Sequence, residues 1–277
     1  MTCSHVITPG VSAAMRQRFL LASLALALTA PVVAPVFAQD APYPGAEPPV
    51  WSATGELGFA MTRGNRQSEN LNTRLLLVQE DSRSKHQLTV SALRAKADVT
   101  VVDADGTSQT LYQTSANRYQ IGGSTSIKVD QVHNWFGAAR YERADYATND
   151  YQGTFSFGYG HHFFNDDATF LLVEMGPGYR RAREASTQDV NSDYIVRGLM
   201  DFGRNLTDNT RLTNTLLVEA GSDNTFAQND LGLTVAMNEA LALKAGLQFR
   251  HNSDVDESAG IKRTDTLSTI NLVYTFK

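Results

Sequence analysis

The stretch DTLSTINLVYTFK (Asp265–Lys277) alternates polar and apolar side chains almost without interruption. Its apolar positions are Ile270, Leu272, Tyr274 and Phe276, and the positions between them are polar apart from Leu267 and Val273. Successive side chains of a β-strand point to opposite faces, so the stretch is predicted to be a strand with one apolar face. That face contacts either a protein core or lipid.

The same alternation recurs in the chain that follows Val50, and helical periodicity does not. Twelve segments can be counted, including a polar-rich strand near Thr110–Lys128. Most of these segments have about ten residues or more, which is the length that a tilted strand needs to cross a bilayer. The pattern therefore favours membrane-crossing strands.

The connections between the segments also alternate in length. Short connections are expected at 81–84, 129–132, 165–167, 207–209 and 238–239, and longer ones at 99–108, 145–150, 182–192 and 253–263. The connections at 63–68 and 223–226 are shorter than this rule requires. An even number of strands, with short turns at one end and longer loops at the other, is typical of outer-membrane barrels.

A soluble sandwich or a lipocalin-type barrel is the alternative, because its strands alternate too. Strands of a sandwich are usually nearer five or six residues long, and an open sheet of twelve strands would leave exposed edges. We therefore predict an all-β fold, a transmembrane antiparallel up-and-down β-barrel of about 12 strands over residues 51–276. The apolar face of the last strand then contacts lipid.

The first 38 residues have the composition of a secretory signal peptide. Arg16 and Arg18 precede the apolar run 19–30, and small residues follow at a cleavage site ending at Ala38. Met15 is an alternative start. The sole cysteine, Cys3, lies in this segment, so the mature chain is predicted to lack disulfides and thiolate metal sites. Residues 39–50 read as a proline-rich periplasmic leader.

Composition excludes several classes of function. The net charge of −5 argues against a nucleic-acid binder that relies on a basic surface. The mean hydropathy of −0.27 excludes a bundle of membrane helices but not a barrel, whose alternating strands average out. The sequence predicts no cofactor and no metal site.

Several stretches suggest a family. WSATGELGFAMTRGNRQSENL (51–71), GTFSFGYGHHFF (153–164), LLVEMGPGYR (171–180) and KRTDTLSTINLVYTF (262–276) resemble the salt-induced outer-membrane protein family, also known as domain of unknown function 481. The resemblance covers residues 51–276. It implies an outer-membrane barrel of Gram-negative bacteria, with a name that links it to salt or osmotic stress and no established molecular activity. Lys277 departs from the pattern, because many such barrels end on the aromatic residue itself.

The face opposite the apolar stripe carries a balanced set of charges. Its basic members are Arg74, Arg118, Arg140, Arg180, Arg197, Arg211, Lys244 and Arg250, and its acidic members are Glu56, Glu142, Glu174, Asp201, Glu219, Asp230 and Asp265. One sign should dominate in a strongly selective pore, whereas a balanced set can form ion pairs that fill a narrow lumen. A twelve-stranded barrel falls between a packed interior and an aqueous channel, so size alone does not decide.

Three smaller motifs call for a structural test. His251 and Ser253, with Asp254 or Asp256, resemble the arrangement in outer-membrane lipid A deacylases, where a histidine would take the serine proton. His161 and His162 are neighbours on a strand and point to opposite faces, so the two rings would not easily share a metal; they are expected to be exposed interfacial residues. Gly158, Gly160, Gly176 and Gly178 are expected to mark bends or close backbone approach, since no helix or Lys-Ser/Thr follows them.

We therefore expect a monomeric outer-membrane barrel with a mostly closed polar lumen and no enzymatic activity. The alternatives are a small-solute channel and, third, a lipid A-modifying hydrolase that uses His251 and Ser253. The expected partners are outer-membrane lipids and lipopolysaccharide and, during insertion, the barrel-assembly machinery and periplasmic chaperones. Tyr274 and Phe276 are expected to act as the C-terminal insertion signal.

Overall fold

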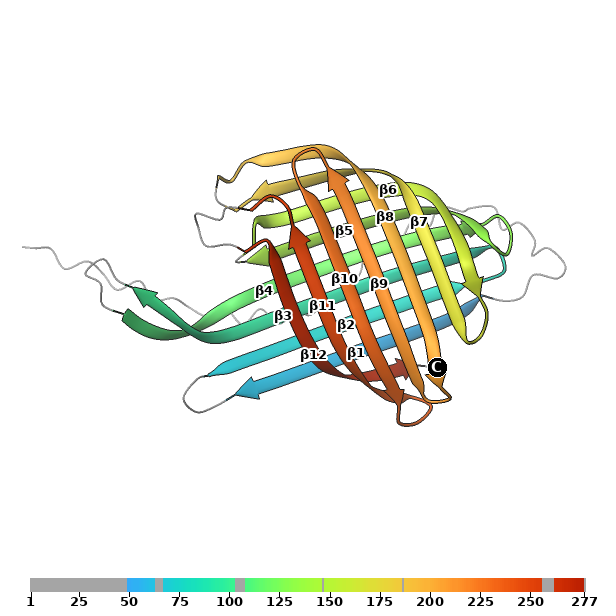
Figure 1. The fold of residues 1–277 in the computed structure, drawn as a ribbon, viewed down its shortest axis with the longest axis horizontal. Helices are drawn as coiled ribbons and strands as arrows, with labels where there is room; N and C mark the ends of the chain where they lie inside the picture. The colour runs from blue at the N-terminus through green and yellow to red at the C-terminus, as the bar shows by residue number, and fades with distance from the viewer. Residues whose placement is uncertain are drawn as a thin grey trace, which may run out of the picture. The chain divides into compact units, whose positions relative to one another are not determined.

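The computed structural model describes residues 49–62, 67–102, 108–145, 147–185, 187–255 and 262–276. The predicted signal peptide and all but the last two residues of the predicted leader lie outside these ranges, as do Cys3 and Met15. Twelve strands form the fold (Figure 1). They are β1 (Val50–Thr62), β2 (Ser68–Glu80), β3 (Ser84–Val102), β4 (Ser108–Lys128), β5 (His133–Asp145), β6 (Asn149–Asn165), β7 (Thr169–Glu184), β8 (Val190–Thr207), β9 (Thr210–Gly221), β10 (Thr225–Ala236), β11 (Leu241–Asn252) and β12 (Thr264–Phe276).

The strands form a closed antiparallel barrel in which each strand pairs with its neighbours in the chain. The barrel closes where β12 pairs with β1, from Ala53 opposite Phe276 to Gly58 opposite Asn271. This pairing closes the barrel over six residues of each strand. The predicted fold class, an up-and-down barrel of about 12 strands, is confirmed. Among the described residues there is no helix that could span a membrane.

Several strands are longer than the sequence indicates. β3 and β4 have 19 and 21 residues, and their ladder continues to Val102 opposite Ser108, within the predicted loop 99–108. β7 and β8 pair as far as Arg183 opposite Val190, within the predicted loop 182–192. These loop predictions were too long, because backbone groups beyond the alternating segments still pair across the hairpins. In Figure 1 the β3–β4 hairpin extends well past the other strands.

The connections divide the barrel into two ends. At the turn end, short turns join β2 to β3, β4 to β5, β6 to β7, β8 to β9 and β10 to β11. At the loop end, the longest connection runs between Asn252 and Thr264. β1 begins and β12 ends at the turn end, because Val50 pairs with Glu80 and Phe276 with Ala53. β1 starts at Val50, the last residue of the predicted leader.

Apolar side chains cover the outside of the barrel. On β12, Ile270 is 69% exposed and Leu272 is 48% exposed, whereas the intervening Val273 is 8% exposed and faces inward. Exposed apolar residues of the same kind, for example Phe59, Trp135 and Leu233, occur on the other strands as well, and on β9 the apolar side chains are half-buried. A contiguous exposed apolar surface of this extent needs an apolar environment. The apolar face of the C-terminal stretch therefore points outward and not into a core.

Glycines allow β6 and β7 to approach closely. A Cβ on Gly158 would lie 2.2 Å from the carbonyl oxygen of Met175, and one on Gly176 would lie 1.9 Å from that of Phe157. Any side chain at these positions would collide with backbone. The interpretation as points of close backbone approach is confirmed for Gly158 and Gly176 and also for Gly178, which faces the carbonyl oxygen of Phe155, whereas Gly160 leaves room for the side chain of Asn134.

Candidate functional site in the barrel lumen

The strand register turns the charged side chains singled out in the sequence toward the lumen. Across neighbouring strands, Glu56 lies opposite Arg74 and Arg118 lies opposite Leu93. Arg250 lies opposite Gln228 on one side and Asp265 on the other. These side chains differ in their surroundings. Some are buried in ion pairs, and others border a cavity.

The buried group, called the charged core below, lies toward the loop end. Its members are Arg140, Glu142, Glu174, Arg180, Asp193, Arg197, Glu219 and Arg250. Arg140 is ion-paired with Glu219, which also accepts a hydrogen bond from Thr154 Oγ1 at 3.2 Å. Arg250 Nη2 donates to Glu142 Oε1 at 2.7 Å, and Arg140 Nη1 lies 3.5 Å from Glu142 Oε2. These carboxylates are each shared between two polar partners.

Two further pairs complete the charged core. Arg180 donates from Nε and Nη2 to the two carboxylate oxygens of Asp193 at 3.1 and 2.7 Å, and Nη2 also donates to the carbonyl of Asn224 at 2.6 Å. Arg197 Nη1 donates to Glu174 Oε2 at 3.1 Å. All four charged side chains are at least nine-tenths buried. Burial of this kind is tolerated only when charges are paired and hydrogen-bonded, as they are here.

Two phenylalanines face the lumen against the general pattern and stack on arginines of the charged core. Phe226, 1% exposed, lies between the guanidinium groups of Arg140 and Arg250, 4.7 and 5.1 Å from its ring centre. Phe136 lies 4.8 Å from the guanidinium carbon of Arg197. Such cation–π contacts stabilise a desolvated cation on a ring face. Apolar and charged side chains thus fill this part of the lumen together.

The charged core joins opposite walls of the barrel. β5 and β11 are six strands apart in a ring of twelve, yet Glu142 of β5 and Arg250 of β11 are hydrogen-bonded. Arg118 of β4 likewise donates to Gln248 of β11 at 2.9 Å. Side chains therefore cross the full width of the lumen at this level.

Three predicted lumen residues make other contacts. Asp201 accepts a hydrogen bond from Thr215 Oγ1 at 2.8 Å, and Arg211 donates to Asn205 and stacks on Phe170. Asp265 is exposed and lies opposite Arg250 in the ladder, but it forms no ion pair with any described residue. These side chains share the lumen face without joining the charged core.

Sequence reasoning missed three members of this region. Asp193 directly follows the predicted connection 182–192 and was not assigned to the lumen face, although it shares the parity of Arg197. Phe226 was assigned to the connection 223–226. Phe136 shares the parity of Arg140, but an apolar residue on the polar face gives no signal by itself. Extending each strand by its parity would have found Asp193.

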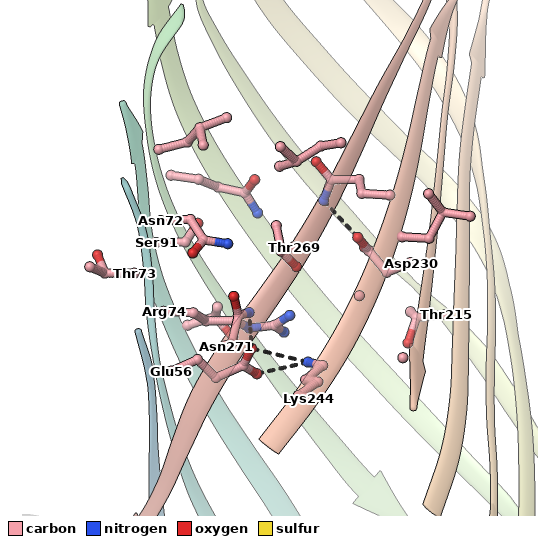
Figure 2. A pocket seen from close by; sticks show the side chains of 18 of the residues that line it. Glu56, Asn72, Thr73, Arg74, Ser91, Thr215, Asp230, Lys244, Thr269 and Asn271 are labelled. Carbon is pink, nitrogen blue, oxygen red and sulfur yellow. Dashed lines mark hydrogen bonds and ion pairs between the residues drawn. The ribbon is translucent and has the colours of Figure 1, made fainter. Parts of the chain in front are cut away.

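A cavity of about 210 Å³ lies between β1–β4 on one side and β9–β12 on the other. This cavity is called the lumen cavity below, and the side chains that line it are rich in amide and hydroxyl groups (Figure 2). The charged residues at its wall are Glu56, Arg74, Arg118, Asp230 and Lys244. Arg118 of β4 donates to Gln248 of β11, which also lines the lumen cavity.

Most charges around the lumen cavity are satisfied by neighbours. Lys244 Nζ donates to both oxygens of Glu56 at 2.8 and 3.1 Å, and Asn271 Nδ2 donates to Glu56 Oε2 at 3.1 Å. Asp230 accepts from Gln248 at 2.6 Å and from Gln228 at 2.7 Å. Figure 2 shows the contacts of Lys244 and Asn271 with Glu56.

The remaining sequence candidates do not assemble into a reactive site. His251 Nδ1 lies 2.9 Å from Thr264 Oγ1. Ser253 Oγ accepts from the backbone N–H of Thr225 and donates to Asn224 Oδ1 at 3.2 Å. In the described ranges the histidine and the serine thus have separate partners, and Asp256 lies outside those ranges.

The paired histidines of β6 differ from expectation. His161 faces outward, 4.6 Å from the ring of Phe163 and 5.0 Å from that of His133. His162 is half-buried and its Nδ1 is enclosed without a hydrogen-bond partner, so it is not an exposed interfacial residue. His162 follows the outward-facing His161 in regular register, so strand alternation turns it to the other face of the sheet. No group of three or more potential metal ligands occurs within the described part of the chain.

A closed barrel with an apolar outer surface and a charged interior defines the class of transmembrane β-barrels. More narrowly, the chain belongs to the family described as Protein of unknown function, DUF481, whose model matches residues 55–276. The resemblance that the sequence motifs suggested is confirmed.

One relative is the "Uncharacterized protein YdiY" of Escherichia coli (strain K12). It is 27% identical over 162 residues, which are 58% of this chain and 62% of that protein. Among solved structures, the NanC porin is 11% identical with a TM-score of 0.45, covering 82% of this chain and all of that one. The translocator domain of autotransporter NalP from Neisseria meningitidis is 11% identical with a TM-score of 0.43, covering 83% and 88%.

Proposed function

We propose that this protein is a monomeric barrel of the bacterial outer membrane whose lumen is closed by its own side chains. It serves the envelope as a structural or stress-related component and has no enzymatic activity. Residues 1–38 direct export to the periplasm, where chaperones and the barrel-assembly machinery receive the chain. Tyr274 and Phe276, whose rings meet edge to face on the outer surface with centres 4.7 Å apart, act as the insertion signal.

The outer surface supports this location. Its exposed aromatic and aliphatic side chains would be costly in water and are stable against lipid acyl chains and lipopolysaccharide. The interior also supports a location in the membrane, because buried charged side chains form ion pairs inside the barrel and do not face the lipid.

The hydrogen bond between Glu142 and Arg250 carries the proposal of a closed lumen. The two side chains come from opposite walls, and Phe226 packs against the same arginine. Ions crossing the barrel would have to break a buried ion pair, which is costly when either partner is left unpaired. An open channel of fixed width would instead keep opposite walls apart.

Two measurements test the proposal. Fractionation should recover the mature protein, starting near Gln39, with outer membranes, and its gel mobility should change on boiling. Single-channel recording on the refolded protein should give a small, weakly selective current or none. A soluble periplasmic protein would overturn the location, and a large steady current would overturn the closed lumen in favour of a channel.

The second candidate function is passage or capture of a small solute, and the lumen cavity is the observation that favours it. The link to salt stress, implied by the family's name, predicts that a deletion strain grows less well at high salt. Unchanged growth over a range of salt concentrations would contradict that link. The third reading, a lipid A hydrolase, lacks a contact between His251 and Ser253 to support it.

A further inference from the structure

One cation at the wall of the lumen cavity lies opposite Glu56 in the ladder but makes no direct hydrogen bond or ion pair with a described residue. This cation is Arg74 of β2, which is exposed there. By contrast, Lys244 is paired with Glu56, and Arg118 donates to Gln248. A guanidinium presents several donors in one plane and binds a carboxylate with two parallel hydrogen bonds. Arg74 is therefore a ready partner for an anionic group inside the lumen.

Two amide oxygens converge near the same wall. A Cβ on Gly58 would lie 2.0 Å from Asn72 Oδ1 and 2.2 Å from Asn271 Oδ1, so the missing side chain leaves room for both. Asn271 is 6% exposed, and its Oδ1 is buried without a hydrogen-bond partner. Its orientation is fixed, because Nδ2 donates to Glu56. A buried acceptor without a donor is costly, and a hydroxyl group would satisfy it.

The rest of the lining restricts the ligand further. Ser91, Gln120, Thr215, Gln228 and Thr269 offer hydroxyls and amides, which both donate and accept. The wall has three cations against two carboxylates, a surplus of one positive charge. A volume of about 210 Å³ is below the usual range for drug-sized ligands, which begins at about 300 Å³.

We infer that the lumen cavity binds a small polyhydroxylated monocarboxylate, a molecule of the sugar-acid class. Its carboxylate pairs with Arg74, and its hydroxyls donate to Asn72 and Asn271. The inference goes beyond the proposed function, because a closed envelope barrel needs no ligand. The two are tested separately: the location and conductance of the barrel do not depend on whether the lumen cavity is occupied.

The experiment uses the full mature chain refolded in detergent micelles, with folding checked by heat-modifiable gel mobility. Isothermal titration compares three probes: D-gluconate, D-sorbitol, which lacks the carboxylate, and acetate, which lacks the hydroxyls. We expect saturable binding of one gluconate per chain. Sorbitol should bind at least about tenfold more weakly because it lacks the charge-assisted hydrogen bonds of the carboxylate, and acetate about tenfold more weakly because it lacks the hydrogen bonds of the hydroxyl groups.

Two variants and one control separate the roles. Arg74→Gln should weaken gluconate binding about tenfold or more and leave sorbitol binding unchanged. Asn72→Ala should weaken gluconate and sorbitol alike. Arg94→Gln removes an exposed arginine that faces outward, opposite Leu71, on the neighbouring strand, and should change nothing.

Three results would overturn the inference. The first is no saturable gluconate binding by a protein that migrates as a folded barrel. The second is an equal loss in Arg74→Gln and Arg94→Gln, which would make the effect one of total charge. The third is acetate binding as tightly as gluconate, which would make Arg74 a general anion site without recognition of hydroxyls.

Discussion

Arg250 and Glu142 come from strands on opposite sides of the barrel, and their side chains are joined by a hydrogen bond of 2.7 Å. Charged side chains therefore extend across the lumen and meet, and do not only line its wall. Glu142 also lies beside Arg140, which is paired with Glu219, so two carboxylates hold two arginines in place.

Removing those carboxylates should open the barrel. In Glu142→Gln with Glu219→Gln, Arg140 and Arg250 lose their anionic partners and repel each other. We expect single-channel recordings to change from little or no current to intermittent, anion-preferring openings. Asp201→Asn is the matched control, because Asp201 faces the lumen but is bonded to Thr215 and not to an arginine. Equal openings in the control would contradict a specific role for the charged core.

The ion pair of Arg180 and Asp193 should matter for stability. Its side chains are 4% and 7% exposed, so Asp193→Asn would leave a buried guanidinium without its anion. We expect a loss of roughly 3–5 kcal/mol in the free energy of unfolding, measured by urea titration in lipid vesicles. Glu80→Gln removes a carboxylate that is about 40% exposed and is paired with Lys85 and Lys128, and because these pairs are open to water it should cost about 1 kcal/mol or less. Similar losses in both variants would show that burial of the Arg180 pair is unimportant.

The outer surface should resist charge. Leu233 is exposed on the outer face of β10, and Leu233→Arg should cost roughly 2–4 kcal/mol if it lies near the bilayer centre. The next residue, Thr234, faces the lumen opposite Arg211 and Lys244. Thr234→Arg should therefore lose less free energy of unfolding, because its side chain does not enter lipid. Denaturant titration in vesicles compares the two. An equal loss would contradict the assignment of Leu233 to lipid.

The fold was predictable because a period of two marks each strand and its faces. The partners within the lumen were not, because parity places Arg74 and Arg140 on the inner face without distinguishing them. Which charges meet depends on how closely opposite walls approach, and here β5 and β11 come within reach of each other's side chains. Phe226 was unpredictable for a related reason: its place in the lumen depends on two arginines from other strands.

The hydrolase reading also makes a prediction. Mass spectrometry of lipid A from cells that express the protein should show no loss of acyl chains, because His251 and Ser253 are bonded to different partners. Detection of acyl release would overturn this expectation. In that case His251→Ala or Ser253→Ala should abolish it while the gel mobility of the barrel is unchanged.

Asp130, in the turn between β4 and β5, should make the stability of the barrel depend on pH in the acidic range. Asp130 is bonded to the His133 ring at 2.7 Å and accepts the N–H groups of Val132 and His133, each at 2.8 Å. These bonds, the His133 ring first, lower the pKa of the Asp130 carboxyl from 3.8 to about 2. A lowered pKa means that the folded barrel favours the carboxylate. Its contribution is therefore complete above pH 3.8 and is lost as the pH falls toward 2.

Urea titrations between about pH 5 and pH 2 test this on the wild type and Asp130→Asn. The wild type should have the higher unfolding midpoint at the upper end, and the difference should shrink as the pH falls below 3.8 and be mostly lost at pH 2, where about half of the folded Asp130 carboxyl groups are neutral. Asp167→Asn is the control, since the carboxylate of Asp167 accepts no hydrogen bond from any described residue. If the difference in unfolding midpoint stays constant down to pH 2, the Asp130→Asn variant is destabilised by the geometry of its amide group. The charge of Asp130 would then not stabilise the turn.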